Sequence, residues 1–314
     1  MTGYVARRLL AIIPLLFLIS LIVFSLSFLI PGDPARTIAG PHASATRVVE
    51  VRHQLGLDQS VIHQYWQWLT HAVSGNLGSS LFTHNTVASE IAHRFPVTLS
   101  LALGALVIAL LIGIPAGIAA GTRPGSIIDR LVTLGTSTAI AVPDFWLGIV
   151  LVIIFAVKLQ ALPAIGYVPL TQSPVGWATH LYLPWFALGI AGAAPIARQL
   201  RGALIDVLAQ DYIRTANAKG LSRPVVVLKH ALKNAAIAPV TVIGIQFAYL
   251  LGGTVIIERI FSLPGLGLYF FDALNAKDLQ VIQGVTLVIA LIFVLINLLV
   301  DVLYAYINPK VRLG

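Results

Sequence analysis

The chain has 314 residues, of which 58% are apolar and only 10% are charged. Soluble domains usually carry about 25% charged residues, so this composition excludes an ordinary soluble protein and indicates a chain that crosses a membrane several times. A net charge of +8 would suggest nucleic-acid binding in a soluble protein, but in a membrane protein it is expected from basic cytoplasmic loops. The absence of cysteine excludes disulfide bonds and thiolate metal sites.

Six apolar segments are long enough to cross a bilayer as helices, which takes about 20 residues. They cover residues 9–30, 97–120, 127–159, 181–204, 235–257 and 281–307. The start of the first resembles a signal peptide, but its apolar run of about 22 residues is too long for one, so we expect a retained span. The third is too long for a straight helix normal to the membrane. Because Pro143 lies inside it, we expect one span kinked there, with two short spans as the alternative.

The distribution of lysine and arginine favours six spans over seven. With six spans and a cytoplasmic N-terminus, 13 of the 20 basic residues fall on the cytoplasmic side. Cytoplasmic segments of membrane proteins carry an excess of these residues, so we expect both termini to be cytoplasmic. Splitting the third segment would instead place the basic residues 211–234 outside, against this rule.

The largest segment expected outside the cytoplasm covers residues 31–96, between the first two spans. Within it, one helical stripe carries Ile62, Tyr65, Trp66, Leu69 and Val73, and two glycines then end the pattern. We expect a small cap of short helices here. The alternative is a helix that lies in the membrane interface, where tryptophan side chains are enriched.

A basic insert, residues 211–234 with the sequence DYIRTANAKGLSRPVVVLKHALKN, separates the fourth and fifth spans. Its first half is predicted to be a helix that ends at Gly220, because glycine is favoured just after a helix. Ser222 and Pro224 are typical of the start of a second helix. This outline resembles a DNA-binding helix-turn-helix, but both ends join membrane spans within a few residues, which disfavours that function. A solvated loop that meets anionic lipid is another alternative.

The turn of the insert contains the small residues Ala216, Ala218 and Gly220, which would let another protein approach closely. With Leu221 and the residues up to Pro239, this turn resembles the EAA loop of bacterial ABC-importer permeases. The motifs YVARRLL, IPGDP, LGLDQ, FPVTLSL, PDFWLGIVLVIIFAVKLQALPAIG, DYIRTANAKGLS, IIERIFSLPGLG and NLLVDVLYAYINPKVR occur in that order. Over nearly the whole chain they resemble the first permease subunit of dipeptide, oligopeptide and nickel importers, a binding-protein-dependent transport system inner membrane component.

The resemblance implies an all-α integral membrane protein with six transmembrane helices and one permease domain over residues 1–314. That domain would comprise the cap (31–96) and a permease core (97–307) that includes the cytoplasmic loop 205–234. In this family the loop forms a coupling helix that sits in a cleft of a cytoplasmic ATPase. The residues expected to contact the ATPase are Thr215, Ala216, Ala218, Lys219, Gly220 and Leu221. Asn217 is a departure, since the family often has a basic residue there.

The family pattern also implies partners, location and cargo. The partners would be a second homologous permease in a heterodimer, two cytoplasmic ABC ATPase subunits or a fused ATPase, an extracytoplasmic substrate-binding protein and membrane lipid, with no nucleic acid. The chain would lie in the plasma (inner) membrane and bind no cofactor itself, with ATP and Mg²⁺ held by the partner ATPase. Short peptides are the expected cargo, and nickel, a metallophore, glutathione or oligosaccharides are the alternatives. A non-transporting receptor or scaffold is the alternative from another class.

Motifs for catalysis are absent from the sequence. There is no G-x-x-x-x-G-K-[ST] phosphate-binding loop, no H-E-x-x-H and no G-x-S-x-G, so the chain is not expected to be an enzyme and its energy must come from a partner. Seven of the eight histidines fall in segments expected outside the cytoplasm. No two of them are spaced to share one face of a helix at i, i+3 or i, i+4, so no metal site is predicted.

Polar residues within the apolar spans are candidates for the translocation pathway. Asp144 follows Pro143 in the third span, where a charge is costly unless it faces protein or water. The alternative for Asp144 is a local cap on backbone N–H groups freed by the proline. Gln246 and Tyr249 in the fifth span are the other two candidates. An outer loop or gate is predicted at Phe261, Pro264, Gly265 and Gly267, with a plain interfacial hairpin as the alternative.

Overall fold

The computed structural model describes residues 2–29, 33–40, 42–54 and 56–307, and its regular elements there are helices, apart from one isolated β-bridge between Ser79 and Thr86. The helices before the basic insert are α1 (Thr2–Leu29), α2 (Pro34–Ala39), α3 (Ala45–Gln54), α4 (Val61–Val73), α5 (Val87–Gly121), α6 (Ile127–Ala141), α7 (Asp144–Leu151), the π-helical turn η1 (Val152–Lys158) and α8 (Pro174–Leu208). From the insert onward they are α9 (Asp211–Ala218), α10 (Arg223–Val225), the π-helical turn η2 (Val226–Ala231), α11 (Leu232–Ala235), α12 (Ile237–Gly253), α13 (Val255–Ile260), α14 (Leu266–Ala276) and α15 (Leu279–Ile307). The all-α fold class is confirmed.

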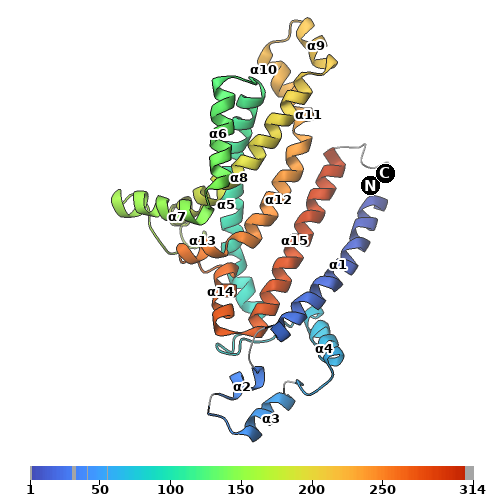
Figure 1. Cartoon of the computed structure of the whole chain (residues 1–314), viewed down its shortest axis with the longest axis vertical. Helices are drawn as coiled ribbons and strands as arrows, with labels where there is room; N and C mark the ends of the chain where they lie inside the picture. Colours follow the sequence, from blue (N-terminus) through green and yellow to red (C-terminus); the bar gives the residue numbers. More distant parts are fainter. Residues whose placement is uncertain (1, 30–32, 41, 55, 308–314) are drawn as a thin grey trace.

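The long helices α1, α5, α8, α12 and α15 run along the long axis of the molecule (Figure 1). Helices α2, α3 and α4 gather at one end and α9 lies at the other, while the start of α1 and the end of α15 lie in the half that carries α9. Four helices in the described residues are long and apolar enough to cross a membrane, or six if each of two bent pairs is one span. The six-span count therefore stays a prediction.

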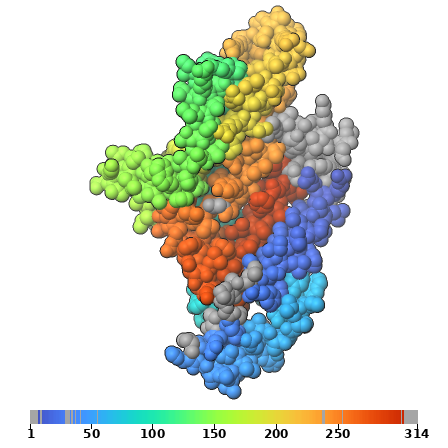
Figure 2. Space-filling model, in the orientation of Figure 1, coloured from blue at the N-terminus to red at the C-terminus, as the bar shows by residue number. Residues whose placement is uncertain are grey.

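The third predicted span is not a continuous helix. Helix α6 ends at Ala141, and α7 starts after Pro143 with its axis turned by 97°. Proline lacks the N–H that would continue α6, and it disfavours helical geometry in Val142, which is extended. The 15 residues of α6 cover only about 22 Å, short of the ~30 Å apolar core of a bilayer. The break predicted at Pro143 is confirmed, and α7 and η1 turn aside and project from the molecule (Figures 1 and 2). That α6 and α7 together form one span stays a prediction.

The predicted cap runs into a long helix. Helix α5 begins at Val87, so residues 87–96, predicted as the last part of the cap, form the first turns of the 35-residue helix that contains the predicted second span. Helix α4 carries the predicted stripe, but only Tyr65 is buried, and its hydroxyl hydrogen-bonds the Ser20 hydroxyl of α1 at 2.8 Å. Ile62 is exposed, because it lies away from the face of α4 that packs against α1.

The most extensive packing between two helices of the described residues joins α5 to α8, and glycines allow their backbones to come close. A Cβ atom on Gly113 would lie 2.8 Å from the carbonyl oxygen of Ala193, and one on Gly117 would lie 2.9 Å from that of Ala197. Small residues allow such backbone approach where lipid provides no hydrophobic drive for packing. The indole N–H of Trp185 also donates to a backbone carbonyl of α5 at 3.0 Å. This contact fixes α8 as the central helix against which α6 and α12 lie.

Candidate functional site

A cavity of about 360 Å³ lies where the end of α6, the start of α7, the middle of α8 and α12 meet. The three residues predicted to line a pathway, Asp144, Gln246 and Tyr249, lie together in its wall. They are the only residues with polar side chains among the described residues that line the cavity. The structure therefore brings together groups that are 102 and 3 residues apart in the sequence, in an otherwise apolar lining.

Asp144 lies at the cavity because it is the first residue of α7, directly after the break that separates α6 from α7. Its Oδ1 accepts a hydrogen bond from the backbone N–H of Phe145 at 2.7 Å, and it occupies the first turn of α7, where the helix dipole favours a negative charge. This is the local contact that the capping alternative predicted, but it involves one N–H group. Among the described residues no cation forms an ion pair with Asp144, so its carboxylate adds net negative charge to the cavity wall.

Gln246 and Tyr249 reach the same cavity from α12. The side-chain amide of Gln246 donates to the carbonyl oxygen of Gly192 in α8 at 3.4 Å, while Tyr249 is 58% exposed. Pro195 lies next to them in α8 and has no N–H to donate to the carbonyl of Ala191, which also lines the cavity. The cavity thus offers a carboxylate, an amide, a phenol and a backbone carbonyl to a polar molecule.

The basic insert forms two helical segments joined by a tight turn at the far end of the molecule (Figure 1). Helix α9 ends at Ala218, and Gly220 follows with φ of +79°, as predicted for a glycine just after a helix. The hydroxyl of Ser222 makes no capping hydrogen bond, although Ser222 occupies the capping position. The two segments are tied by a hydrogen bond of 2.8 Å from Asn234 to the hydroxyl of Tyr212.

The residues predicted to contact an ATPase do not share one environment. Thr215, Ala218, Lys219, Gly220 and Leu221 are exposed. Ala216, in contrast, is only 7% exposed and belongs to an apolar cluster formed by the end of α8, α9, η2 and α11. Ala216 therefore holds α9 against the rest of the chain, and the exposed surface of the turn is formed by its neighbours.

The predicted outer loop is organised around a residue that the sequence analysis did not single out, Glu258. Its side chain is fully buried and accepts hydrogen bonds from the hydroxyls of Thr98 and Thr254, at 2.8 and 3.0 Å, and from the backbone N–H of Leu268 at 2.9 Å. Gly265 and Gly267 are buried against this carboxylate, and a Cβ atom at either position would meet its oxygen. An acid in the apolar run IIERIF was the signal available.

Phe261 and Pro264 take opposite positions in this loop. Phe261 is 1% exposed and packs against Gly148 of α7, and its carbonyl accepts from the N–H of Gly166 at 3.0 Å. Pro264 is exposed. In the following helix α14, burial raises the pKa of the Tyr269 hydroxyl to about 12, so this group stays neutral at physiological pH.

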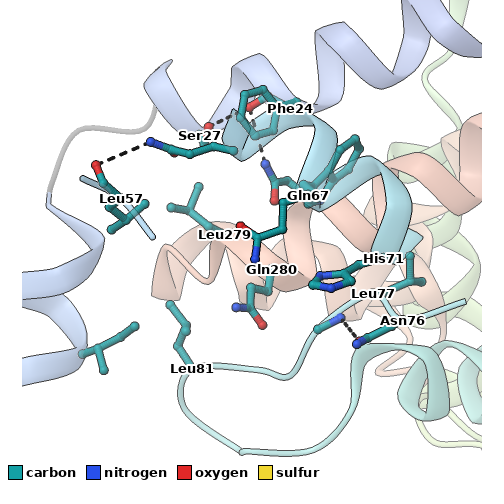
Figure 3. Close-up of a pocket in the computed structure, with 15 residues that line it drawn as sticks. Phe24, Ser27, Leu57, Gln67, His71, Asn76, Leu77, Leu81, Leu279 and Gln280 are labelled. Atoms are coloured by element: carbon teal, nitrogen blue, oxygen red, sulfur yellow. Dashed lines mark hydrogen bonds between the residues drawn. The ribbon is translucent and has the colours of Figure 1, made fainter. Parts of the chain in front are cut away.

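A second cavity, of about 260 Å³, lies between α1, α4 and the start of α15 (Figure 3). Amide side chains such as Gln67 and Gln280 line it together with His71 and apolar residues, and its described lining contains no Asp, Glu, Lys or Arg. Within the described residues no group of three or more His, Cys, Asp or Glu could hold a metal ion.

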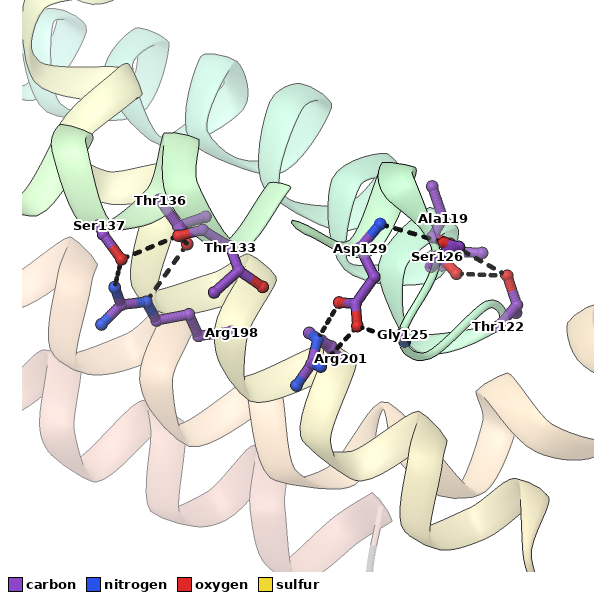
Figure 4. Close-up of polar contacts among 11 residues, drawn as sticks. Ala119, Thr122, Gly125, Ser126, Asp129, Thr133, Thr136, Ser137, Arg198 and Arg201 are labelled. Carbon is purple, nitrogen blue, oxygen red and sulfur yellow. Dashed lines mark hydrogen bonds and ion pairs between the residues drawn. The ribbon is translucent and has the colours of Figure 1, made fainter. Parts of the chain in front are cut away.

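A row of polar contacts between α6 and α8 was also missed (Figure 4). Arg201 of α8 forms an ion pair with Asp129 of α6, and Arg198 donates to Thr136 and Ser137. Both arginines lie near the end of the predicted span 181–204 and were counted only among the basic residues of the cytoplasmic side. A serine three residues before Asp129 is typical of a helix start, but nothing local in the sequence pairs it with a residue 72 positions away.

Comparison with known proteins shows which family the chain belongs to. Residues 113–313 match the binding-protein-dependent transport system inner membrane component family, and residues 1–102 match the N-terminal part of the membrane component of such systems. The chain belongs to this family. It is 46% identical, over 99% of both chains, to the glutathione transport system permease protein GsiC of Escherichia coli strain K12. The same identity and coverage hold for the protein of that name in Shigella boydii serotype 4.

Solved structures of transporters show the same fold. The permease resembles the inward-facing MetNI methionine ABC transporter in its native crystal form, with a TM-score of 0.56 and 21% identity over 69% of this chain and 96% of that one. A second crystal form of MetNI gives the same TM-score at 20% identity. The chain is therefore a permease subunit of an ABC importer of the dipeptide and oligopeptide type. It is a multi-pass protein of the inner membrane and not an enzyme, because ATP hydrolysis belongs to the partner ATPase of such systems.

Proposed function

We propose that this permease forms half of a translocation pathway for short peptides, with glutathione as the favoured cargo. The 46% identity to permeases of glutathione transport systems, over 99% of both chains, supports this choice of cargo. Glutathione is a tripeptide with an ammonium group, two amides and two carboxylates. The cavity around Asp144 offers a partner for the ammonium group, and Gln246 and Tyr249 offer donors for carbonyl or carboxylate oxygens.

The other half of the pathway would come from a second, homologous permease in a heterodimer. Asp144 and its neighbours cover only one side of a space that is open in the single chain. The extracytoplasmic binding protein would deliver cargo near the outer loop, at Phe261, Pro264, Gly265 and Gly267. Membrane lipid would cover the remaining apolar surface, including the exposed side chains of α7.

Coupling to ATP hydrolysis would occur at the exposed turn of the basic insert. Thr215, Ala218, Lys219, Gly220 and Leu221 present a narrow surface that a cleft of the ATPase can accept. ATP and Mg²⁺ would be held by the ATPase subunits, with no cofactor on this chain. The insert and both termini would then be cytoplasmic, and ATP-driven closure of the ATPase dimer would rock the helices around the cavity to give alternating access.

Uptake by cells that lack their own peptide importers tests this proposal. The permease is expressed with its partner subunits, and uptake of labelled glutathione is measured against unlabelled dipeptides, tripeptides, Ni²⁺ and oligosaccharides. We expect ATP-dependent glutathione uptake that small peptides reduce and that Ni²⁺ and oligosaccharides leave unchanged. Uptake of Ni²⁺ or an oligosaccharide alone would contradict the proposed cargo. A permease that is stable alone and never copurifies with an ATPase would instead be a receptor or scaffold.

A further inference from the structure

Helix α6 is attached to α8 by polar contacts rather than by an apolar core. Its only buried residues are Asp129 and Thr136. Ile127, Leu131 and Leu134 are between 62% and 75% exposed, and no residue of α6 takes part in the apolar clusters of the described chain. Lipid tails are as apolar as these side chains, so exposed Ile and Leu do not drive α6 onto α8 in a membrane. The polar contacts are therefore the specific interactions between α6 and α8.

Two groups of contacts form this polar seam, which we define as Asp129, Thr136 and Ser137 of α6 with Arg198 and Arg201 of α8 (Figure 4). The guanidinium group of Arg201 donates through both Nε and Nη2 to the carboxylate of Asp129, with a distance of 2.8 Å for the Nη2 contact. Two turns further along α6, Arg198 donates from Nη2 to the hydroxyl of Ser137 at 2.7 Å and from Nε to that of Thr136 at 3.3 Å. Both arginines thus fix the register of α6 along α8.

The pair of Asp129 and Arg201 is partly shielded from solvent. The side chain of Asp129 is 6% exposed and that of Arg201 is 32% exposed. Asp129 Oδ2 also accepts a hydrogen bond from the backbone N–H of Gly125 at 2.8 Å, which ties the turn before α6 into the same group. Bidentate contacts between a guanidinium and a carboxylate are among the stronger and more directional hydrogen bonds in proteins. This geometry resists sliding of one helix past the other.

Helix α6 lies between the basic insert and the cavity that contains Asp144, and the proposed function requires movement to pass from one to the other. In the turn between α5 and the start of α6, the carbonyl of Thr122 accepts a hydrogen bond of 2.6 Å from Arg223 of the basic insert. At the end of α6, residues 139–145 form one wall of the cavity that contains Asp144. Helix α8 passes the same cavity and continues into α9 after only two residues. A movement of the insert therefore reaches the cavity wall by two routes, and the polar seam joins them.

We infer that the polar seam makes α6 move together with α8 and the basic insert, so that movement of the ATPase reshapes the cavity wall at Pro143 and Asp144. This inference rests on the proposed function, because it assumes that the insert receives movement from an ATPase. Asp129 and Arg201 are positioning residues in this device and do not contact cargo. Without the seam, the insert would still move with the ATPase, but α6 would no longer follow it.

The test measures cargo imported per ATP hydrolysed by the complete transporter in proteoliposomes. Asp129→Asn keeps the shape of the side chain and removes its charge. We expect this variant to copurify with its ATPase and hydrolyse ATP as the wild type does, while cargo per ATP falls about tenfold, the loss typical of a charge-assisted hydrogen bond. The matched control is Glu50→Gln, which breaks the exposed ion pair of Glu50 with Arg47 at the opposite end of the molecule and should leave the ratio unchanged.

A second variant keeps the inference testable if Asp129→Asn does not accumulate in the membrane. The double substitution Thr136→Val and Ser137→Ala removes both acceptors of Arg198 and adds no charge to an apolar surface. The same fall in cargo per ATP is expected. Wild-type cargo per ATP in these variants, or a parallel loss of ATPase copurification, would overturn the inference. A wild-type transporter that imports no peptide would contradict the proposed function. The inference about the polar seam is tested separately, by cargo imported per ATP hydrolysed for any cargo that the wild type does import.

Discussion

Thr98 of α5 donates a hydrogen bond of 2.8 Å to Glu258 of α13, across 160 residues of sequence. The same hydroxyl oxygen accepts from the backbone N–H of Leu266 at 2.8 Å. Glu258 in turn accepts from Thr254 and from the N–H of Leu268. The Glu258 carboxylate and the Thr98 hydroxyl thus accept the backbone N–H groups of Leu268 and Leu266, and the outer loop is anchored to α5 through Thr98.

Replacing this carboxylate should destabilise the outer loop strongly. Glu258→Leu removes the acceptor for Thr98, Thr254 and Leu268 in a site with no exposed surface. Each buried donor left without a partner costs about 1–3 kcal/mol, so we expect a loss of more than about 3 kcal/mol. The measurement is thermal unfolding of the purified transporter together with protease sensitivity of residues 261–265. Glu258→Gln, which keeps one acceptor oxygen, should be milder. Equal stability of Glu258→Leu and the wild type would show that the turn does not depend on this carboxylate.

The approach of Gly265 to Glu258 gives an independent prediction. A Cβ atom on Gly265 would overlap the carboxylate of Glu258, so Gly265→Ala should displace the loop and lower the unfolding temperature. Gly202 of α8 is the matched control, because nothing lies within 4 Å of its Cβ position. Gly202→Ala should be neutral or stabilise the helix by up to about 1 kcal/mol. The account fails if both alanine variants unfold at the same temperature.

The helical fold and the three polar residues of the cavity could be predicted from the sequence. A polar side chain in an apolar span is costly, so Asp144, Gln246 and Tyr249 stood out from their surroundings. The turn at Gly220, just after α9, was predictable because glycine is favoured in the left-handed conformation that follows a helix. Each of these features can be recognised from a few neighbouring residues, either from a local backbone signature or from a polar residue among apolar ones.

Features that depend on distant pairs were not predictable from one sequence. The ion pair of Asp129 with Arg201 joins residues that look like ordinary loop charges when each is read alone. Glu258 was overlooked because it adjoins Arg259 at the end of a predicted span, which suggests a solvated pair rather than a buried anchor. The proline break at Pro143 was located, but the angle of 97° depends on how α7 packs against α13 and α8.

The orientation of the chain in the membrane can be tested with single cysteines, because the chain contains none. Ser79 and Ser222 are both exposed, and they lie on segments expected on opposite sides. We expect Ser79→Cys to react with a membrane-impermeant thiol reagent in intact cells, and Ser222→Cys to react only after permeabilisation. The reverse labelling pattern would overturn the expected topology.

The role of Asp144 is tested by Asp144→Asn, which removes the charge and keeps the shape. The variant should assemble normally, because the carboxylate has no ion pair among the described residues and the amide oxygen can still accept from Phe145. Uptake of cargo with a free ammonium group should fall about tenfold, as expected for one lost charged contact. A variant that fails to assemble would favour the capping role, and unchanged uptake would exclude a role for the charge in the pathway.

Gly220 in the turn of the basic insert should matter more than the cation beside it. Its φ of +79° is a conformation in which a Cβ atom costs about 1 kcal/mol or more, and a branched side chain costs more still. Nothing lies within 4 Å of its Cβ position, so the effect of Gly220→Val would come from the backbone and from bulk offered to the ATPase. Lys219 is exposed, and an exposed charge contributes only about 0–1 kcal/mol. We therefore expect Gly220→Val to weaken ATPase docking and uptake together, and Lys219→Ala to be much milder.

Copurification of the ATPase, uptake and basal ATP hydrolysis are measured for each variant. Gly220→Asn separates the two causes, because asparagine tolerates the left-handed conformation but still adds a side chain to the turn. If Gly220→Asn copurifies with more ATPase than Gly220→Val but less than the wild type, part of the loss of docking in Gly220→Val comes from backbone strain. Capture of cargo by the binding protein should be unchanged in every variant, since that site lies on another chain. If Gly220→Val docks and transports fully while Lys219→Ala abolishes both, the insert acts as an electrostatic tether and its shape is not what couples it to the ATPase.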